Sequence, residues 1–319
     1  MGTKVYAPDL NTIRKMRNNN ISTLLISPGA INVFRANKDF QDALLAEGIH
    51  IYMPTTQEWN RNEQQQLKEV SIEDLLPRDE ISIDMESVGS MFHGKRILIT
   101  GSAGSIGSEM VRQIAKYSPA ELILIDSAET PQHDIRLMMA KQFPEIKAET
   151  IVTTICSKSR MEHIFKTYLP DYVFHAAAYK HVPMMENNPC ESIQNNVYGT
   201  KILADLAVKY GVKKFVMIST DKAVNPTNVM GCSKRICEIY VQSLNKAIEE
   251  GIINGKTQFV TTRFGNVLGS NGSVIPLFKK QIKAGGPVTV TDPRIIRYFM
   301  LIPEACKLVL EAGTKGNGG

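Results

Sequence analysis

One stretch of this sequence, Lys95 to Asp126, constrains the fold more than any other. It opens with the apolar run Arg96–Thr100, which predicts a short buried strand, and this strand runs directly into a turn with glycines at 101, 104 and 107. Glycines at that spacing let the backbone turn tightly and approach a pyrophosphate closely. The helix that begins near Ser105 would direct its first N–H groups and its positive dipole end at the anion. The stretch therefore predicts a dinucleotide-binding strand, turn and helix.

An acidic residue follows the next apolar strand. The strand Leu122–Ile125 is followed by Asp126, nineteen residues after Gly107, where a carboxylate can bind both hydroxyls of an adenosine ribose. A glycine triplet alone is also compatible with a flexible loop, but here strand, turn, helix, strand and acid occur in the expected order. Asp126 favours NAD over NADP, because a carboxylate repels a 2′-phosphate and residues 127–129 bring no arginine to offset it.

The composition is that of an ordinary globular chain. Of 319 residues, 43% are hydrophobic and 22% are charged, and the net charge of +5 comes without a dense basic run, which favours anionic ligands over nucleic acid. The five cysteines include no CxxC pair, so we expect reduced thiols and no metal site. No apolar run approaches the roughly 18 residues of a membrane helix, and the start lacks a signal-peptide core. We therefore expect a soluble, cytoplasmic chain.

The pattern of strands, helices and polar stretches divides the chain into three parts. Residues 1–58 alternate two short apolar strands, Ser22–Ser27 and Ile49–Met53, with helical stretches, and predict a small α/β domain that opens abruptly and so lacks its beginning. Residues 59–93 are polar and contain proline, and they predict a linker. We expect residues 94–319 to form the dinucleotide-binding domain, with a substrate-binding part that is cut short at the C-terminus.

Strands and helices alternate strictly after Asp126. That rhythm predicts an α/β fold with a doubly wound parallel sheet, helices on both faces, and ligands at the carboxyl ends of the strands. From Gln258–Arg263 onward the rhythm is lost, and we expect loops and short elements that close over a substrate. The predicted elements between these points are helices at Ile135–Phe143, Met161–Tyr168, Ile193–Tyr210 and Ser233–Glu250, and strands at Ile151–Thr154, Tyr172–His175 and Lys214–Ser219.

Polar residues gather after two of the predicted strands. In residues 175–181, small side chains would let the backbone pass close to a cofactor, while longer polar ones project toward a substrate. His175 fits either a hydrogen-bonded, half-buried histidine or a functional one. The second group is Ser219–Lys222, followed by Met230–Lys234. The candidates in the first group are Ala176 and Ala177 for the cofactor, and Lys180 and His181 for the substrate.

The sequence resembles the extended short-chain dehydrogenases/reductases, and within them the nucleotide-sugar 4,6-dehydratases of bacterial polysaccharide and glycan biosynthesis. The similarity runs over residues 68–319 and lies in Thr100–Gly107, His175–Glu186, Ser219–Lys234 and Arg263–Ser273. The Ser-Thr-Asp-Lys and Met-Gly-x-x-Lys sequences are similar to the branch that acts on UDP-N-acetylglucosamine. Full-length members of that branch carry membrane helices before a small α/β domain, which places the full-length form at the cytoplasmic face of the inner membrane.

The resemblance implies NAD-dependent 4,6-dehydration of UDP-N-acetylglucosamine to a UDP-4-keto-6-deoxy-N-acetylhexosamine. It makes Asp221 the acid, Lys222 the base that takes the proton from carbon 5, and Thr220 the residue that positions the 4-hydroxyl. Lys234 would bind the nicotinamide ribose, and Met230 stands where most relatives have a tyrosine. The implied cofactor-binding residues are Gly101, Ser102, Gly104, Ser105, Ile106, Gly107, Asp126, Ala176, Ala177 and Lys234. The implied substrate contacts are Lys180, His181 and Met230, with Arg263, Asn266, Ser270, Ser273 and Arg297 at the UDP.

Four positions depart from that resemblance. Thr154 stands where relatives often hold adenine with an aspartate, and Asn271 replaces a frequent arginine. Asp292 and Arg294 differ from the Thr-His-Pro-Asp sequence that is usual there. These positions leave details of adenine and nucleotide contact open.

Two rival functions remain open. A UDP-sugar 4-epimerase shares fold and cofactor but needs no carbon-5 base, so Lys222 distinguishes it. A non-catalytic dinucleotide sensor or scaffold would keep the glycine turn without needing the polar strand ends. The family resemblance implies a homo-oligomer, and the sequence leaves the carbon-5 configuration of the product open.

Overall fold

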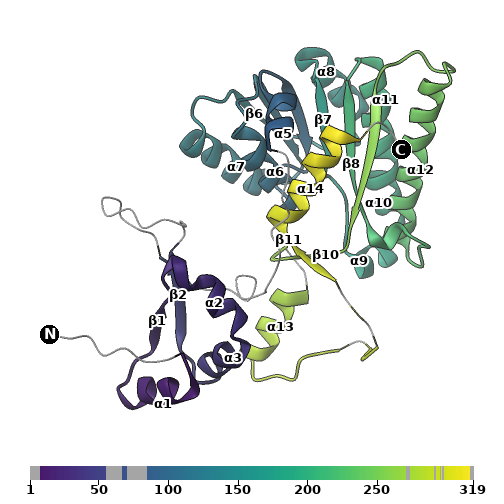
Figure 1. The fold of residues 1–319 in the computed structure, drawn as a ribbon. Helices are drawn as coiled ribbons and strands as arrows, with labels where there is room; N and C mark the ends of the chain where they lie inside the picture. The colour runs from purple at the N-terminus through teal and green to yellow at the C-terminus, as the bar shows by residue number, and fades with distance from the viewer. Residues whose placement is uncertain are drawn as a thin grey trace. The chain divides into compact units, whose positions relative to one another are not determined.

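The computed structural model describes residues 8–54, 67–69, 85–270, 274–290, 292–294, 296 and 298–316. The chain divides into two compact units, Met1–Glu80 and Ile81–Gly319 (Figure 1). The division falls inside the predicted linker of residues 59–93.

The second unit is built on a six-stranded, all-parallel sheet with the strand order β6-β5-β4-β7-β8-β9 (Figure 1). The chain runs from the central strand β4 outward through β5 and β6, and then returns to the other side of β4 to form β7. Ligands of such sheets bind at the carboxyl ends of the strands where the order reverses, which here is between β4 and β7. The strands are β4 (Arg96–Thr100), β5 (Glu121–Asp126), β6 (Ala148–Val152), β7 (Tyr172–His175), β8 (Lys214–Thr220) and β9 (Gln258–Phe264).

Helices cover both faces of this sheet, which explains why its central strands are continuous apolar runs. Alternate residues of β4 enter opposite cores: Ile97 and Ile99 pack with one cluster, and Leu98 packs with the other. The first core takes side chains from α5 (Met85–Phe92), α6 (Ser105–Ala115), α7 (Glu129–Gln142) and α14 (Ile302–Lys315). The second takes them from α8 (Lys158–Tyr168), α11 (Gly199–Lys209) and α12 (Val229–Glu249). The predicted doubly wound parallel sheet is confirmed.

Two segments of the second unit differ from the sequence expectation. Gln258–Phe264, where the rhythm was expected to end, forms the sixth parallel strand and pairs with β8 along its whole length. The predicted single helix Ile193–Tyr210 is instead a π-helix, η2 (Ile193–Tyr198), followed by α11. The remaining elements are short: α9 (Val182–Asn187), α10 (Pro189–Ser192), the 3-10 turn η3 (Asp221–Ala223), β10 (Asn266–Leu268), α13 (Val274–Lys283) and β11 (Phe299–Leu301).

The first unit is a small α/β structure with its own core. The strand β2 pairs in parallel with β1 and antiparallel with β3, and Phe34, Leu44 and Ile51 are among the residues of the core. The antiparallel strand β3 and the helix α5 lie within residues 59–93, and the side chains of α5 pack in the core of the second unit. The elements of the first unit are α1 (Leu10–Asn18), β1 (Thr23–Leu25), η1 (Pro28–Ala30), α2 (Ile31–Ala36), α3 (Lys38–Ala46), β2 (His50–Pro54) and β3 (Leu67–Glu69).

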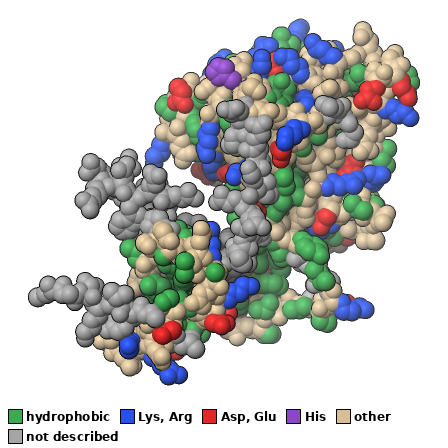
Figure 2. Space-filling view, in the orientation of Figure 1, with side chains coloured by type: hydrophobic (Ala, Val, Ile, Leu, Met, Phe, Trp, Pro, Cys, Tyr) green, Lys and Arg blue, Asp and Glu red, His purple; other side chains and the backbone are tan. Residues whose placement is uncertain are grey.

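Charged side chains of both signs are interspersed on the face drawn in Figure 2, and no dense basic patch covers that face. This distribution agrees with a net charge of only +5 over 319 residues. In the part of the chain that the structure describes, no helix combines the length and apolar character that crossing a bilayer requires. The same described residues contain no group of three or more histidine, cysteine or acidic side chains placed to hold a metal ion.

Candidate functional site

The glycine turn after β4 is packed so tightly that side chains are excluded at two of its positions. Gly101 has a φ of +67°, and a Cβ there would lie 2.7 Å from the backbone nitrogen of Ala177. A Cβ on Gly107 would lie 1.9 Å from the carbonyl oxygen of Gly101, far inside contact distance. The helix α6 begins at Ser105 as predicted, and no side chain caps its N-terminus at Gly104. The N-terminus of α6, with its positive dipole end, therefore lies at this turn, as an anion-binding turn requires.

Hydrogen bonds of the Asp126 and Ser102 side chains stabilise this turn. The carboxylate of Asp126 accepts hydrogen bonds from the backbone N–H of Ala103 (3.0 Å) and of Ala128 (2.9 Å). The hydroxyl of Ser102 is buried and donates to Oε1 of Gln132 at 2.8 Å, so its side chain faces the protein interior. The sequence analysis missed Gln132, which also donates to the carbonyl of Leu124 at the end of β5.

A cavity of about 820 Å³ extends from the glycine turn across the carboxyl ends of β7 and β8 to the segment after β9. Its volume lies in the range of small-molecule sites. Among the predicted site residues, it is lined by Gly101, Gly104, Ser105, Ile106, Gly107, Ala176, Lys180, His181, Thr220, Lys222, Met230, Lys234, Asn266 and Ser270. Ser102, Asp126, Ala177, Asp221 and Arg263 are not among its lining residues, and Ser273 and Arg297 lie outside the described residues.

Thr220, Asp221 and Lys222 form one hydrogen-bonded cluster where β8 ends. Oδ1 of Asp221 accepts from the Thr220 hydroxyl at 2.8 Å and from Nζ of Lys222 at 3.0 Å. Partial burial alone would raise the pKa of the Asp221 carboxyl, but these hydrogen bonds outweigh burial and lower that pKa below its ordinary value. The Asp221 carboxyl therefore rests ionised beside the Lys222 amine. A proton that moved along the hydrogen bond would convert it into a carboxylic acid beside a neutral amine.

Two further lysines face the cavity without an acceptor among the described residues. Lys234, on the second turn of α12, is 5% exposed, and burial lowers its pKa. Lys180, in the loop after β7, also has its pKa lowered by burial. Lys180 is exposed, whereas the amine of Lys234 is buried, and a buried amine without a partner is costly unless a ligand supplies one. The hydroxyls and phosphates of a dinucleotide or a nucleotide sugar are acceptors of that kind, so these residues fit such a ligand.

His175 also lies away from the cavity. Its ring is fully buried, with Nδ1 2.8 Å from the Thr100 hydroxyl and Nε2 2.8 Å from the Thr200 hydroxyl. Burial, with the charge of Lys234 acting in the same direction, lowers its pKa to about 3. Of the two interpretations left open by the sequence, the hydrogen-bonded structural histidine is the one observed. It ties the end of β4 to α11.

Arg263 also has a structural partner in place of a ligand. Its guanidinium donates to both carboxylate oxygens of Glu238, at 2.7 and 2.5 Å, and Glu238 is fully buried on α12. A second arginine, Arg235, donates to the same carboxylate at 3.0 Å. Its guanidinium is thus occupied by Glu238 beside β9 and does not line the cavity, and the expected contact of Arg263 with UDP stays a prediction.

The sequence analysis missed a polar contact that shapes the wall of the cavity. The Asn196 side chain, on the π-helix, accepts from the N–H of Tyr179 at 2.8 Å and donates to the carbonyl of Tyr179 at 3.0 Å. It also donates to the hydroxyl of Ser233 at 3.0 Å. Two consecutive asparagines inside an otherwise helical stretch were the available signal. Further lining residues that were not singled out are Tyr179, Met184, Met185, Asn188, Glu191, Ile218, Phe264, Gly265, Val267, Val274 and Phe299.

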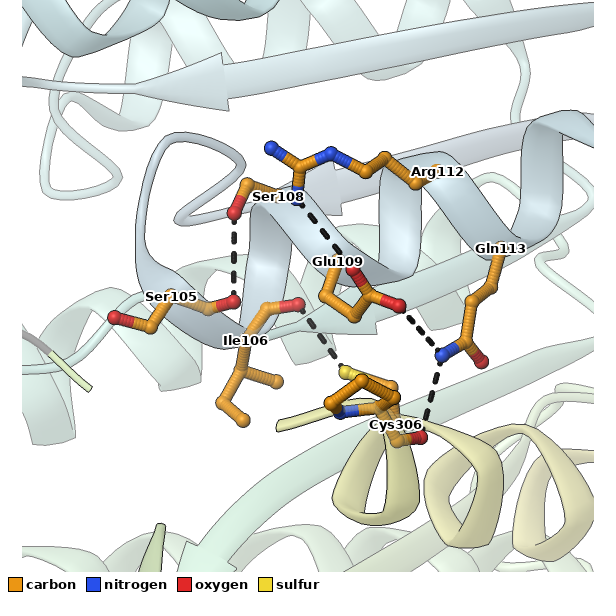
Figure 3. Close-up of polar contacts among 8 residues, drawn as sticks. Ser105, Ile106, Ser108, Glu109, Arg112, Gln113 and Cys306 are labelled. Atoms are coloured by element: carbon orange, nitrogen blue, oxygen red, sulfur yellow. Dashed lines mark hydrogen bonds and ion pairs between the residues drawn. The ribbon is translucent and has the colours of Figure 1, made fainter. Parts of the chain in front are cut away.

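The start of α14 is hydrogen bonded to α6, the helix that follows the glycine turn. Nε2 of Gln113, on α6, donates to the Glu109 carboxylate at 2.8 Å and to the carbonyl of Pro303 at 3.2 Å (Figure 3). The thiol of Cys306, on α14, donates to the carbonyl of Ile106. The start of α14 follows β11, which pairs with β10. These contacts hold β10 and its cavity residues, Asn266 and Val267, in a fixed relation to the turn.

The departures from the family pattern lie outside this cavity or outside the described residues. Thr154 accepts a hydrogen bond from the N–H of Cys156 and closes a turn after β6. Arg294 donates twice to the Asp292 carboxylate on the surface. Asn271 is not among the described residues.

Comparison with known proteins places the chain among enzymes and proteins of polysaccharide synthesis. The family described as "Polysaccharide biosynthesis protein" matches residues 97–319. The chain is 48% identical to the capsular polysaccharide biosynthesis protein CapD of Staphylococcus aureus, over 98% of the chain and 52% of that protein. It is 36% identical to a UDP-N-acetylglucosamine 4,6-dehydratase (inverting) of Campylobacter jejuni, over 72% of the chain and 66% of that protein. A UDP-glucose 4-epimerase of Rickettsia akari is also 36% identical, over 72% and 65%.

The chain thus spans about half the length of CapD. Among solved structures, Pen from Bacillus thuringiensis superimposes with a TM-score of 0.66 at 33% identity, over 72% of this chain and 67% of that one. DesIV of Streptomyces venezuelae, a dTDP-glucose 4,6-dehydratase solved with NAD bound, superimposes with a TM-score of 0.61 at 23% identity, over 70% and 73%. The second of these supports the fold alone.

Proposed function

Since the chain belongs to the polysaccharide biosynthesis protein family, we propose that it catalyses NAD-dependent 4,6-dehydration of UDP-N-acetylglucosamine to a UDP-4-keto-6-deoxy-N-acetylhexosamine. The observation that carries this proposal is the position of Thr220, Asp221 and Lys222. Thr220 and Lys222 line the same cavity as the glycine turn, and Asp221 is hydrogen bonded to both. An acid and a base therefore stand together beside a dinucleotide-shaped turn.

Removal of water from carbons 5 and 6 of a hexose needs both of these groups. The neutral amine of Lys222 takes the proton from carbon 5, and the carboxylic acid of Asp221 gives a proton to the hydroxyl that leaves carbon 6. Together these transfers release one molecule of water. Because Asp221 rests ionised, we infer that its acid form comes from Lys222 along their 3.0 Å hydrogen bond. That single transfer produces the acid and the base at once, and closure of the site around a substrate favours it, since desolvation disfavours the charged pair.

The cofactor is assigned to the turn and to the residues that face it. Gly101, Gly104 and Gly107 let the backbone approach a pyrophosphate, and the N-terminus of α6 supplies N–H donors. Lys234 would donate to the nicotinamide ribose, and Asp126 would meet the adenosine ribose. NAD, when bound, would accept a hydride from carbon 4 and return it to carbon 6. The hydroxyl of Thr220 orients the 4-hydroxyl, whose proton passes to solvent as the hydride leaves carbon 4. When the hydride reaches carbon 6, the ammonium of Lys222 gives a proton back to carbon 5, and Lys222 then regains a proton from solvent.

The direct test is incubation of the protein with NAD and UDP-N-acetylglucosamine, followed by mass spectrometry of the nucleotide sugar. Loss of one water supports the dehydratase. A product of unchanged mass but altered 4-hydroxyl configuration would instead support a 4-epimerase, the alternative favoured by the similarity to the Rickettsia akari protein. Binding of NAD with no change in the sugar would support a non-catalytic dinucleotide sensor.

A further inference from the structure

Tyr179 is a cavity residue to which the reaction above gives no role. It lies in the loop after β7, its side chain is 44% exposed, and it lines the cavity. No hydrogen bond of its phenol hydroxyl to another described residue is found. Among the lining residues, Tyr179 is the one that brings a phenol hydroxyl to the cavity.

The main chain of Tyr179 is held more firmly than that of an ordinary loop residue. Both its N–H and its carbonyl bond to the side chain of Asn196, at 2.8 and 3.0 Å. Asn196 is 1% exposed and lies on the π-helix, so the anchor itself is fixed in the core. A residue that serves only to connect two elements needs no such clamp, whereas a residue that positions a ligand gains from one.

The same clamp connects Tyr179 to the reactive end of the cavity. Asn196 donates to the Ser233 hydroxyl at 3.0 Å, and Ser233 donates to the carbonyl of Met230 at 2.7 Å. Three hydrogen bonds in series thus join the carbonyls of Tyr179 and Met230, which places these two oxygens within about 9 Å of each other. Met230 stands in the first turn of α12 and lines the cavity.

That turn of α12 also touches the catalytic cluster. A Cβ on Gly231 would lie 2.2 Å from the carbonyl oxygen of Lys222, so the two backbones are in direct contact. Tyr179, Met230 and Lys222 therefore border one region of the cavity. The dinucleotide turn lies against Ala176 and Ala177, three and two residues before Tyr179 in the same loop.

We propose that the phenol hydroxyl of Tyr179 binds the hexose of the nucleotide sugar at the reactive end of the cavity, an assignment that rests on the proposed function. The hydroxyl donates to or accepts from a sugar hydroxyl, and the ring forms part of the wall against which the hexose lies. Tyr179 is thus a substrate-positioning residue, and Asn196 fixes it relative to Lys222.

The experiment compares UDP-N-acetylglucosamine with UDP, which lacks the hexose, in calorimetric titrations of the NAD-loaded protein. Tyr179→Phe removes only the hydroxyl, and loss of one hydrogen bond should weaken UDP-N-acetylglucosamine binding about threefold to tenfold. Affinity for UDP and for NAD should stay at the parental value. Tyr198→Phe is the matched control, because Tyr198 is 46% exposed and does not line the cavity.

Two outcomes would overturn the assignment. Equal weakening for UDP and UDP-N-acetylglucosamine would place the phenol at the nucleotide, and unchanged affinity for both would mean that it touches neither. Failure of the proposed function is recognised separately, because the parental protein would then leave the mass of UDP-N-acetylglucosamine unchanged. Steady-state rates of Tyr179→Phe complete the test, with kcat/KM expected to fall and thermal stability to match that of Tyr198→Phe.

Discussion

Replacement of Gly107 by alanine tests the packing of the cofactor turn most sharply. The added Cβ would stand 1.9 Å from the carbonyl oxygen of Gly101, 2.7 Å from its carbonyl carbon and 2.9 Å from Cα of Ser102. All three are backbone atoms, so no side chain can rotate away. Real Cβ contacts essentially never fall below 3.0 Å. The helix α6 and the turn must therefore separate by roughly 1 Å, an overpacking that costs about 1–3 kcal/mol.

The same displacement moves the N–H groups of α6 away from the pyrophosphate position. Misplacement by about 1 Å can cost as much as about 10²-fold in a positioned interaction, so NAD affinity should fall at least tenfold. Calorimetric titration with NAD and a thermal melt measure the two effects. Gly104→Ala is the control, because its Cβ would lie 3.2 Å from the same oxygen, and it should fold with near-parental stability. Parental stability together with parental NAD affinity in Gly107→Ala would refute the described packing.

Three further predictions concern individual side chains. Asp126 should make the protein bind NAD more tightly than NADP, and Asp126→Ala should lose that preference; tighter NADP binding by the parental protein in parallel titrations would contradict this. Met230→Ala should keep turnover within about tenfold, since a thioether cannot transfer a proton, and a variant that binds NAD but is inactive would show that the site depends on this side chain. His175 has a pKa of about 3 in the folded protein, so it stays neutral there, whereas in the unfolded chain it takes up a proton below about pH 6.5. The contribution of the neutral ring to the free energy of unfolding is therefore complete above pH 6.5 and is lost as pH falls toward 3. At about pH 5 the free energy of unfolding should be lower by about 2 kcal/mol. Between about pH 7.5 and pH 5, the urea midpoint of His175→Asn should therefore fall less than that of the parental protein. Equal falls would contradict a buried neutral histidine.

The sheet and the cofactor turn could be predicted because their signals are local. Arg96–Thr100 and Leu122–Ile125 are buried on both faces, so each reads as an unbroken apolar run whatever packs against it. The turn between them has to contain glycine for steric reasons that involve its own backbone. These features need no knowledge of distant parts of the chain.

The missed features depend on partners far away in sequence. The π-helix carries Asn196, which binds the backbone of Tyr179 seventeen positions away and Ser233 thirty-seven positions away. The ion pair of Arg263 with Glu238, twenty-five positions earlier, was likewise not visible in the sequence. The strand β9 was missed because it has one neighbour in the sheet and mixes threonines and an arginine with its apolar residues.

The central claim is that Lys222 removes the carbon-5 proton of UDP-N-acetylglucosamine. The most direct measurement is incorporation of solvent deuterium at carbon 5 when the NAD-loaded protein turns over in deuterated water, compared between the parental protein and Lys222→Ala. We expect the variant to lose turnover by 10² or more, which is about the share of one general base, and to lose deuterium exchange with it, while NAD binding persists. Deuterium incorporation at near the parental rate in Lys222→Ala would contradict the assignment of Lys222 as the base.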